Sequence, residues 1–531
     1  MPWFRQSKRS VTTPHTVIIG AGPGGLAAAM LLAARGVRVT IVERLDHVGG
    51  RSGAIETPEG YRFDRGPTFF LYPQILREIF AACGHSLDTE VDLRRVDPLY
   101  RLMFEDGGTL DVASDPGRLR AAVATLSPGD AANIDRYMTD NRQKLAAFAP
   151  ILQRPMQSVF DLMHPTMLAA LPKLRPHRTV DGDLARYFSD ERVRLAFSFQ
   201  SKYLGMSPFK CPSLFTILSF MEHEHGIWHP IGGCNAVVQA MARVARAMGV
   251  DIRLSDPVEA IQFEGRRAVG VKTATAEIAC DALVVNADFA NTMAQLVPNA
   301  LRRRWTNQRL NRAKFSCSTY MLYLGLEGRE EGLAHHTIRL AADYRDNIRA
   351  IEDGDRLPDN PSFYVQNACV TDPSLAPPGH SALYLLIPVG NLSGGLDWTA
   401  LGDRYRSVAI RCLESVGVRD VERRIRAERR LTPLDWQTDL SVHHGATFNL
   451  AHTMDQMLLF RPRNRFDDLD GVYLVGGGTH PGSGLPVIFE SARITTSLMA
   501  KDFGLANLPD ASSHPVTDHD RSPIAATQGA E

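Results

Sequence analysis

The opening of the chain switches between two hydrophobic patterns. β-Branched residues dominate 16–20 and 37–42, which predicts two short strands. Between them, 25–35 is rich in Ala and Leu and predicts a helix, and Gly36 is suited to end it. A strand, a helix and a second strand in close succession predict a βαβ unit.

The same segment imitates a membrane span, because Val17–Ala34 is almost wholly apolar and follows a basic start. Four glycines and a proline lie between Gly20 and Gly25, and such a cluster breaks a helix. No other stretch approaches the roughly 20 apolar residues that a spanning helix needs. The sequence therefore predicts no transmembrane segment.

Further along, residues 116–224 have apolar positions at helical spacing. The pattern after them predicts the following elements: a helix over 236–248, strands over 251–254, 258–263, 268–273 and 282–286, a mixed region over 316–465, a strand over 472–475 and a helix over 487–501.

One helical stretch, Leu145–Leu174, is apolar, rich in Met and interrupted by four prolines. Two interpretations stay open. The stretch forms kinked core helices, or it forms an apolar surface that dips into a lipid interface.

Composition narrows the function classes. A chain of 531 residues is long enough for two domains. Lys and Arg together equal Asp and Glu at 59 each, so no overall field attracts nucleic acid. The seven cysteines show no CxxC spacing, which argues against a metal site or a disulfide framework and fits a reducing, cytoplasmic setting.

A G-x-G-x-x-G pattern lies between the first strand and the first helix. Gly20 permits the tight turn, Gly22 lets the backbone approach a pyrophosphate, and Gly25 lets helix and strand pack closely. Glu43 ends the second strand, where its carboxylate can accept hydrogen bonds from ribose hydroxyls. Strand, helix and acidic terminus together predict a dinucleotide site.

Two further glycine clusters indicate which dinucleotide. Residues 43–53 read ERLDHVGGRSG, and residues 471–486 read GVYLVGGGTHPGSGLP before a helix. Both resemble the flavin-containing amine oxidase and carotenoid desaturase superfamily. The resemblance implies FAD as the cofactor, with a helix N-terminus near the flavin. The expected cofactor contacts are Gly20, Gly22, Gly24, Gly25, Glu43, Arg44, Gly50, Arg51, Val258, Gly477, Gly484 and Pro486.

Other segments narrow the resemblance to bacterial-type phytoene desaturases. Thr479–Pro486 is similar to a signature of that family, and the likeness covers about residues 15–505. The supporting segments are GIWHPIGG at 226–233, VNAD at 285–288, FYVQNACVTDPSLAPPG at 363–379 and FNLAHTMDQMLLFRPRN at 448–464.

This resemblance implies an α/β fold, in which a Rossmann-like FAD-binding domain carries an inserted α+β substrate domain. The expected FAD domain is discontinuous, with residues 15–110, 226–300 and 466–505. The substrate domain takes 111–225 and 301–465, between a flexible start at 1–14 and a disordered tail at 506–531.

The implied activity is desaturation of a long isoprenoid polyene of the phytoene or diapophytoene type, with hydride transfer to the flavin. Delocalisation of the developing cation leaves little need for acid–base help from the protein. The expected partners are the apolar polyene, a membrane surface contacted peripherally, and quinone or oxygen as electron acceptor.

The chain departs from the family at Phe489 and Glu490, where smaller, uncharged residues are expected. Glu490 is interpreted as a first-turn carboxylate of the helix or as a catalytic base. His480 is a second catalytic candidate, although loop histidines more often serve as structural partners. The adjacent pairs His335–His336 and His443–His444 do not have metal-ligand spacing.

Three alternatives stay open. The protein could oxidise or isomerise a carotenoid end group, as an oxidase, ketolase or isomerase of the same family. It could be a flavin amine oxidase, which would favour a charged or aromatic pocket. It could be a prenyl-lipid escort protein that makes no use of flavin.

Overall fold

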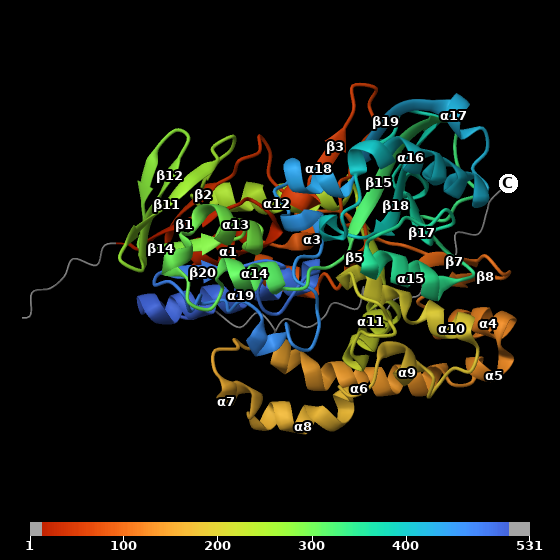
Figure 1. The fold of residues 1–531 in the computed structure, drawn as a ribbon, viewed down its shortest axis with the longest axis horizontal. Helices are drawn as coiled ribbons and strands as arrows, with labels where there is room; N and C mark the ends of the chain where they lie inside the picture. The colour runs from red at the N-terminus through yellow and green to blue at the C-terminus, as the bar shows by residue number, and fades with distance from the viewer. Residues whose placement is uncertain (1–12, 509–531) are drawn as a thin grey trace, which may run out of the picture.

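The structure is a computed structural model that describes residues 13–508. Its first sheet has five parallel strands, and both the first and the last strand of the chain belong to it (Figure 1). In spatial order the strands are β10 (Asp251–Arg253), β2 (Arg38–Val42), β1 (His15–Ile19), β14 (Ala282–Val285) and β20 (Val472–Leu474).

Side chains of β1 alternate between the two faces of this sheet. Ile18 packs in a core with three helices, which are α1 (Pro23–Ala33), α12 (Cys234–Ala247) and α19 (Leu485–Phe503). Val17 and Ile19 pack on the other side against α13 (Phe289–Leu296) and an antiparallel sheet of β11 (Val258–Glu264), β12 (Arg267–Thr273) and β13 (Glu277–Ala279). A parallel sheet covered on both faces explains why its strands read as continuous apolar runs. The expected Rossmann-like α/β fold is confirmed.

A second, seven-stranded sheet forms the upper right of Figure 1. Its order is β19 (Ile425–Leu431), β15 (Ser318–Glu327), β18 (His380–Val389), β17 (Phe363–Asn367), β16 (His336–Leu340), β7 (Tyr100–Phe104) and β8 (Thr109–Val112), and α16 (Trp398–Ser415) packs on it. The expected boundary assigned residues 100–110 to the FAD domain. Within this range, β7 pairs with β16 and with β8 in the seven-stranded sheet.

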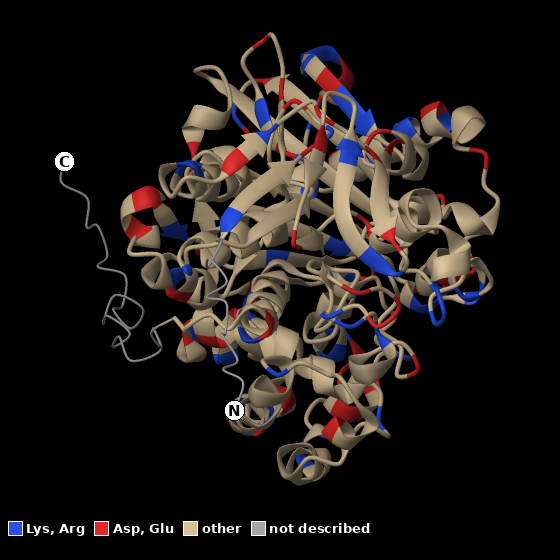
Figure 2. Cartoon of the chain, turned by 90° about the vertical axis from the view of Figure 1, so that its left-hand side faces the viewer, with Lys and Arg blue, Asp and Glu red and all other residues tan. Residues whose placement is uncertain are grey.

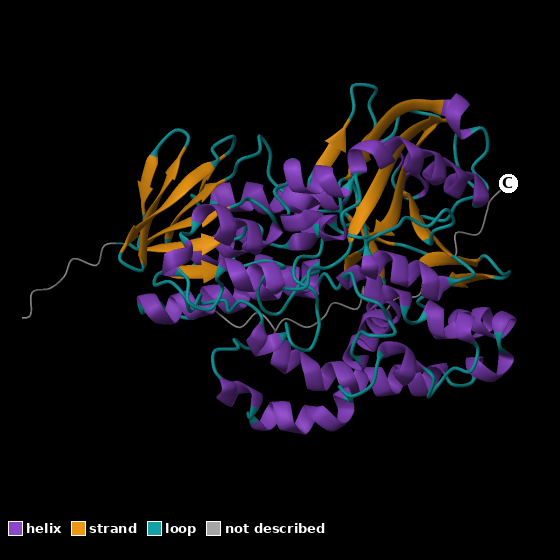
Figure 3. Ribbon diagram, viewed as in Figure 1, coloured by secondary structure: helices purple, strands orange, loops and turns teal. Residues whose placement is uncertain are grey.

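Helices gather below both sheets (Figure 3). They are α4 (Pro116–Leu126), α5 (Pro128–Ala131), α6 (Ile134–Leu152), α7 (Val159–Leu162), α8 (Pro165–Leu174), α9 (Val180–Leu184), α10 (Glu191–Ala196) and α11 (Ile217–His225). Shorter elements join the layers: β3 (Ala54–Glu56), β4 (Arg62–Asp64), β5 (Phe70–Leu71), β6 (Leu93–Arg95), β9 (Ile227–Pro230), α2 (Gln74–Ala82), α3 (Leu87–Glu90), α14 (Asn307–Arg312), α15 (Tyr344–Asp353), α17 (Val421–Arg424) and α18 (Pro433–Thr438).

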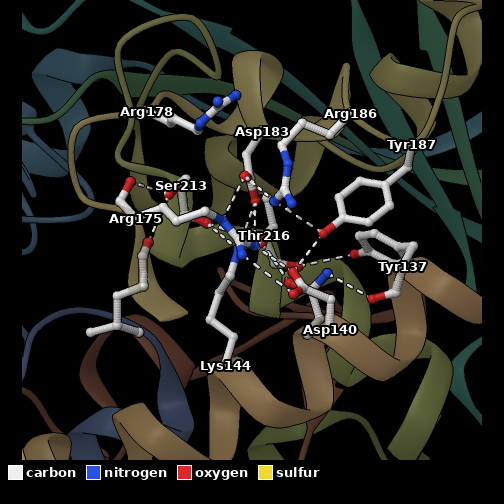
Figure 4. A network of polar contacts seen from close by, with 12 residues as sticks. Tyr137, Asp140, Lys144, Arg175, Arg178, Asp183, Arg186, Tyr187, Ser213 and Thr216 are labelled. Atoms are coloured by element: carbon white, nitrogen blue, oxygen red, sulfur yellow. Dashed lines mark hydrogen bonds and ion pairs between the residues drawn. The ribbon is translucent and has the colours of Figure 1, made fainter. Parts of the chain in front are cut away.

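A buried charge network holds the helical region together (Figure 4). Lys144 of α6 has no exposed surface, and its Nζ lies 2.9 Å from Asp183 Oδ2 of α9 and 2.7 Å from Thr216 Oγ1. Arg175, which ends α8, donates from Nε to Asp183 Oδ1 at 2.9 Å and also pairs with Asp140 of α6. Three helices are thus tied by charge-assisted hydrogen bonds rather than by apolar packing alone.

The two interpretations of Leu145–Leu174 apply to different parts of the stretch. Phe148 and Ile151 of α6 are buried in a small core. Along α7 and α8, which form the lower edge of Figure 1, Val159 is 61%, Phe160 75% and Met163 66% exposed. The first half is therefore a core helix. The second half buries Met167, Ala170 and Leu174 in the same small core and exposes apolar side chains on its outer side.

Within residues 13–508, no helix combines the length and the apolar character needed to cross a membrane. Basic and acidic residues are interspersed over the elements (Figure 2), in keeping with a formal net charge of zero. The flexible start and disordered tail fall almost wholly on 1–12 and 509–531, outside the described residues.

Candidate flavin and substrate site

The first glycine loop has the geometry that a pyrophosphate cradle requires. Gly20 has a φ of +100°, which only glycine adopts without strain, and its backbone turns the chain from β1 into α1. A Cβ on Gly25 would lie 2.2 Å from the carbonyl oxygen of Gly20, so strand and helix approach too closely for any side chain. The first turn of α1 directs unpaired N–H groups and the positive end of the helix dipole at the loop.

Asn286, at the end of β14, fastens this loop from the neighbouring strand. Its Nδ2 donates to the carbonyl oxygen of Gly20 at 3.1 Å. A Cβ on Gly24 would lie 2.6 Å from Asn286 Oδ1, which explains the glycine there. Asn286 belongs to the VNAD segment at 285–288, whose sequence alone does not indicate this role.

Glu43 lies where β2 ends, at the rim of the same loop. Its Oε2 accepts from the Ala21 N–H at 2.7 Å, and its Oε1 accepts from the Leu45 N–H at 3.0 Å. A carboxylate has lone pairs left after two such bonds, so Glu43 can still accept from ribose hydroxyls. Arg44 and Val258 line the same wall.

The second glycine loop presents a partly buried cation. Arg51 follows Gly50, whose φ is +52°, and donates from Nη1 to the carbonyl oxygen of Thr447 at 2.7 Å. With its amide nitrogen toward Asp288, Asn449 donates to Asp288 Oδ2 at 2.8 Å, and its oxygen accepts from Arg51 at 3.0 Å. Burial lowers the pKa of Arg51 and raises the pKa of Asp288, and each charge opposes the shift of the other.

The C-terminal glycine cluster is held by a buried arginine, Arg461. Arg461 has no exposed surface and donates to the carbonyl oxygens of Gly477 at 2.7 Å, Leu450 at 3.1 Å and Thr479 at 3.1 Å. Burial lowers the pKa of Arg461 to about 9. Arg461 belongs to the Phe-Arg-Pro part of the segment at 448–464. The sequence alone does not show which groups a buried guanidinium binds.

The three glycine loops meet at one cavity of about 740 Å³. Every expected cofactor contact lines it except Gly25, whose role is to let α1 and β1 pack. Gly484, with a φ of +113°, and Pro486 place the N-terminus of α19 at the same cavity. Backbone cradle, helix N-termini and a partly buried arginine together fit a dinucleotide.

The cavity then leaves the parallel sheet and becomes apolar. Its walls continue along α6, α11 and the seven-stranded sheet, and they reach the C-terminal end of α6 beside α7. The lining there includes Leu145, Phe148, Leu152, Leu218, Met221, Met321, Ile338, Leu340 and Leu386. A long apolar ligand can therefore lie against whatever the glycine loops hold.

Glu490 lines the cavity but does not lie in the first turn of α19. The helix begins at Leu485, and its first turn carries no acidic residue, so the first-turn interpretation is wrong. Burial raises the pKa of Glu490, and Arg493, whose Nη1 lies 3.3 Å from its carboxylate, opposes that shift. The catalytic-base interpretation stays a prediction, and Phe489 packs into the core behind the sheet.

His480 is buried but is not part of the cavity wall. Its Nε2 lies 2.9 Å from the carbonyl oxygen of Arg154, in the turn between α6 and α7. Burial lowers the pKa of His480 to about 4, so the imidazole is neutral near pH 7. This geometry supports a structural contact between the glycine loop and the helical region, not the catalytic role first considered.

The family comparison agrees with this geometry. Residues 23–498 match the family described as flavin containing amine oxidoreductase. The chain is 43% identical over 491 residues to the 4,4'-diapophytoene desaturase (4,4'-diapolycopene-forming) of Methylomonas sp, covering 92% of this chain and 96% of the relative. It is 38% identical to the all-trans-zeta-carotene desaturase of Myxococcus xanthus, covering 97% and 98% of the two chains.

Solved structures share the fold at much lower identity. An oxidoreductase from Methanosarcina mazei aligns with a TM-score of 0.62 at 17% identity, over 91% of this chain and 99% of that one. A putrescine oxidase bound to putrescine aligns with a TM-score of 0.59 at 15% identity, over 93% and 99%. With its glycine loops, cavity and relatives taken together, the chain belongs to the flavin-containing amine oxidoreductase family, and within it to the carotenoid desaturases.

Proposed function

We propose that the protein is an FAD-dependent desaturase that introduces conjugated double bonds into a polyene of the phytoene or diapophytoene type. The observation that carries the proposal is the single cavity, which joins the dinucleotide loops to an apolar channel. When bound, the flavin would accept a hydride from an allylic carbon of the polyene.

The residues of the chain would bind and orient the flavin and the polyene and shield them from water. Glu43 and the loop at Gly20–Gly25 would hold the ribose and pyrophosphate, and Arg51 would lie beside the bound dinucleotide. The apolar lining of α6 and α11 would hold the polyene extended and exclude water. The long apolar channel favours this substrate class over the small amines of an amine oxidase.

The test uses purified protein with FAD and phytoene or diapophytoene in liposomes, with products followed by absorbance and mass. Red-shifted products that have lost pairs of hydrogens are expected. Products that carry added oxygen, or that differ only in geometry, would favour the end-group oxidase or the isomerase. No product from either polyene would exclude the desaturase.

We also propose that α7 and α8 contact a membrane surface, from which the polyene enters. The support is the exposure of apolar side chains beside the end of the cavity; Leu168 of α8 is 53% exposed. Flotation with liposomes tests this, and a protein that stays with the aqueous fraction would count against it. Electrons would pass on to quinone or oxygen, which anaerobic turnover with and without added quinone would distinguish.

A further inference from the structure

A chain of buried polar side chains leads away from the cavity, between β16, β17 and β9. Thr68 and Tyr364 line the cavity, and their hydroxyl oxygens lie 2.8 Å apart. Behind them, His336 Nδ1 lies 2.7 Å from Tyr364 Oη, and the His336 ring stacks on Phe69 at a centroid distance of 4.1 Å. The flavin loop is close, since a Cβ on Gly66 would lie 2.7 Å from the Arg51 carbonyl oxygen.

Two more histidines extend the chain toward the outside. The ring of His335 contacts that of His336 at 4.4 Å and that of His229 at 4.8 Å. His229 Nε2 lies 3.4 Å from Asp372 Oδ2, and Asp372 Oδ1 accepts from the exposed Ser374 hydroxyl at 2.5 Å.

Ring nitrogens along this path lack partners among the described residues. Nε2 of His336 and Nδ1 of His229 are buried without a hydrogen bond, and both rings contact His335. Buried polar atoms in native proteins are nearly always satisfied, so each of these nitrogens calls for an internal water. The residues do not form a metal site, because no group of three possible ligands among residues 13–508 is arranged for one.

We propose that Tyr364, His336 and His229 carry the proton released during desaturation from the cavity to solvent beside Asp372. This inference rests on the proposed function. Each new double bond would release one proton into a cavity whose substrate-binding part is mostly apolar, and this path gives that proton a route out.

The step balances as follows. One C–H bond gives up a hydride, which the flavin would accept. The neighbouring C–H bond breaks, its electron pair becomes the new π bond, and its proton passes to Tyr364 Oη as the Tyr364 proton moves to His336 Nδ1. His336 releases its Nε2 proton through internal water to His229 Nδ1, and His229 passes its own Nε2 proton to Asp372, which hands it on to solvent and is ionised again.

The charges around the path favour passage of the proton over its retention on one residue. Burial lowers the pKa of His336 well below its usual value, and the neighbouring histidines add to that shift, so a proton does not rest there. Although burial alone would raise the pKa of Asp372, hydrogen bonds from His229, Ser374 and the Gly232 N–H lower it, so the carboxylate stays ionised at the outer end.

The test compares Tyr364→Phe with Tyr61→Phe. Tyr61 Oη lies 2.5 Å from His380 Nδ1, so the control removes the same kind of hydroxyl–imidazole bond away from the cavity. Tyr364→Phe should lower kcat roughly 10²-fold, and turnover should become slower in D₂O, with flavin content and melting temperature close to those of the control. Equal kcat and equal solvent isotope effects in the two variants would overturn the relay.

His336→Phe interrupts the path one step further back without altering the cavity wall, and it keeps a ring to stack on Phe69. It should lower kcat by a similar factor with KM unchanged, and wild-type turnover with full flavin content would overturn the proposal. A wild-type protein that converts no polyene would instead refute the proposed function.

A readout independent of turnover is ¹⁵N NMR of histidine-labelled protein without flavin. His336 should be neutral at pH 7 with its proton on Nε2, and Tyr364→Phe should change its Nδ1 signal while Tyr61→Phe does not. A His336 that is protonated at pH 7, or is indifferent to Tyr364, would contradict the proposed path.

Discussion

The dinucleotide end of the cavity and the helical region at its other end are built in opposite ways. At the dinucleotide end, glycine loops present their backbone to the cavity, and the glycines keep side chains out. Around α6, α8 and α9, long charged side chains are buried, while apolar side chains of α7 and α8 face outward. One end is thus shaped by close backbone contacts, whereas the other is held by buried charge and exposes apolar side chains.

The comparison predicts that the dinucleotide end tolerates almost no added volume. Gly25→Ala places a methyl group 2.2 Å from the Gly20 carbonyl oxygen, a backbone atom that cannot rotate away. The variant should be purified without flavin, as judged by the yellow absorbance bands. Gly129→Ala in α5 meets nothing within 4 Å and should keep its flavin. Full flavin content in Gly25→Ala would mean that the dinucleotide end tolerates added volume, contrary to this comparison.

The helical region should instead be sensitive to loss of charge. Lys144→Met leaves Asp183 buried with one fewer partner, which should cost about 3–5 kcal/mol of unfolding free energy. Lys210→Met is the matched control, because its pair with Glu352 is exposed and should contribute only about 0–1 kcal/mol. Denaturant titration of both variants checks this. Equal losses of unfolding free energy would show that the buried charge network contributes no more than an exposed ion pair.

Glu490, at the junction of the two regions, predicts a dependence on pH. Its pKa is raised in the folded state, so the folded protein holds this proton more tightly, and stability falls as pH rises past the unfolded value. Glu490→Gln stays neutral and should therefore be more stable than the wild type at pH 8 and equally stable at pH 4. A gain of the same size at both pH values would point to packing rather than charge.

The smallest effect on stability is expected at the apolar surface. Phe160→Asp with Met163→Asp changes side chains that are 75% and 66% exposed, so the unfolding free energy should change by less than about 0.5 kcal/mol. Binding to liposomes should nevertheless fall sharply. A marked loss of stability, or flotation unchanged from the wild type, would show that these side chains do not serve as a lipid-facing surface.

Local sequence patterns were sufficient to predict the dinucleotide end of the cavity. The spacing of Gly20, Gly22 and Gly25 between a strand and a helix predicts the loop, because backbone conformation there depends on residues a few positions apart. Glu43 was predictable for the same reason, and the superfamily likeness supplied the later glycine clusters. The apolar run of 145–174 was recognised, but its division into core and surface was not.

Only the tertiary structure decided the contacts that join distant segments. Arg461 binds the loop at Gly477, Asn286 fastens the loop at Gly20, and β7 joins β16 across more than two hundred residues. In the sequence, His336 is only one member of an adjacent histidine pair. The structure places it beside Tyr364 and the cavity. Such contacts depend on which elements pack together, and neither periodicity nor local spacing encodes that choice.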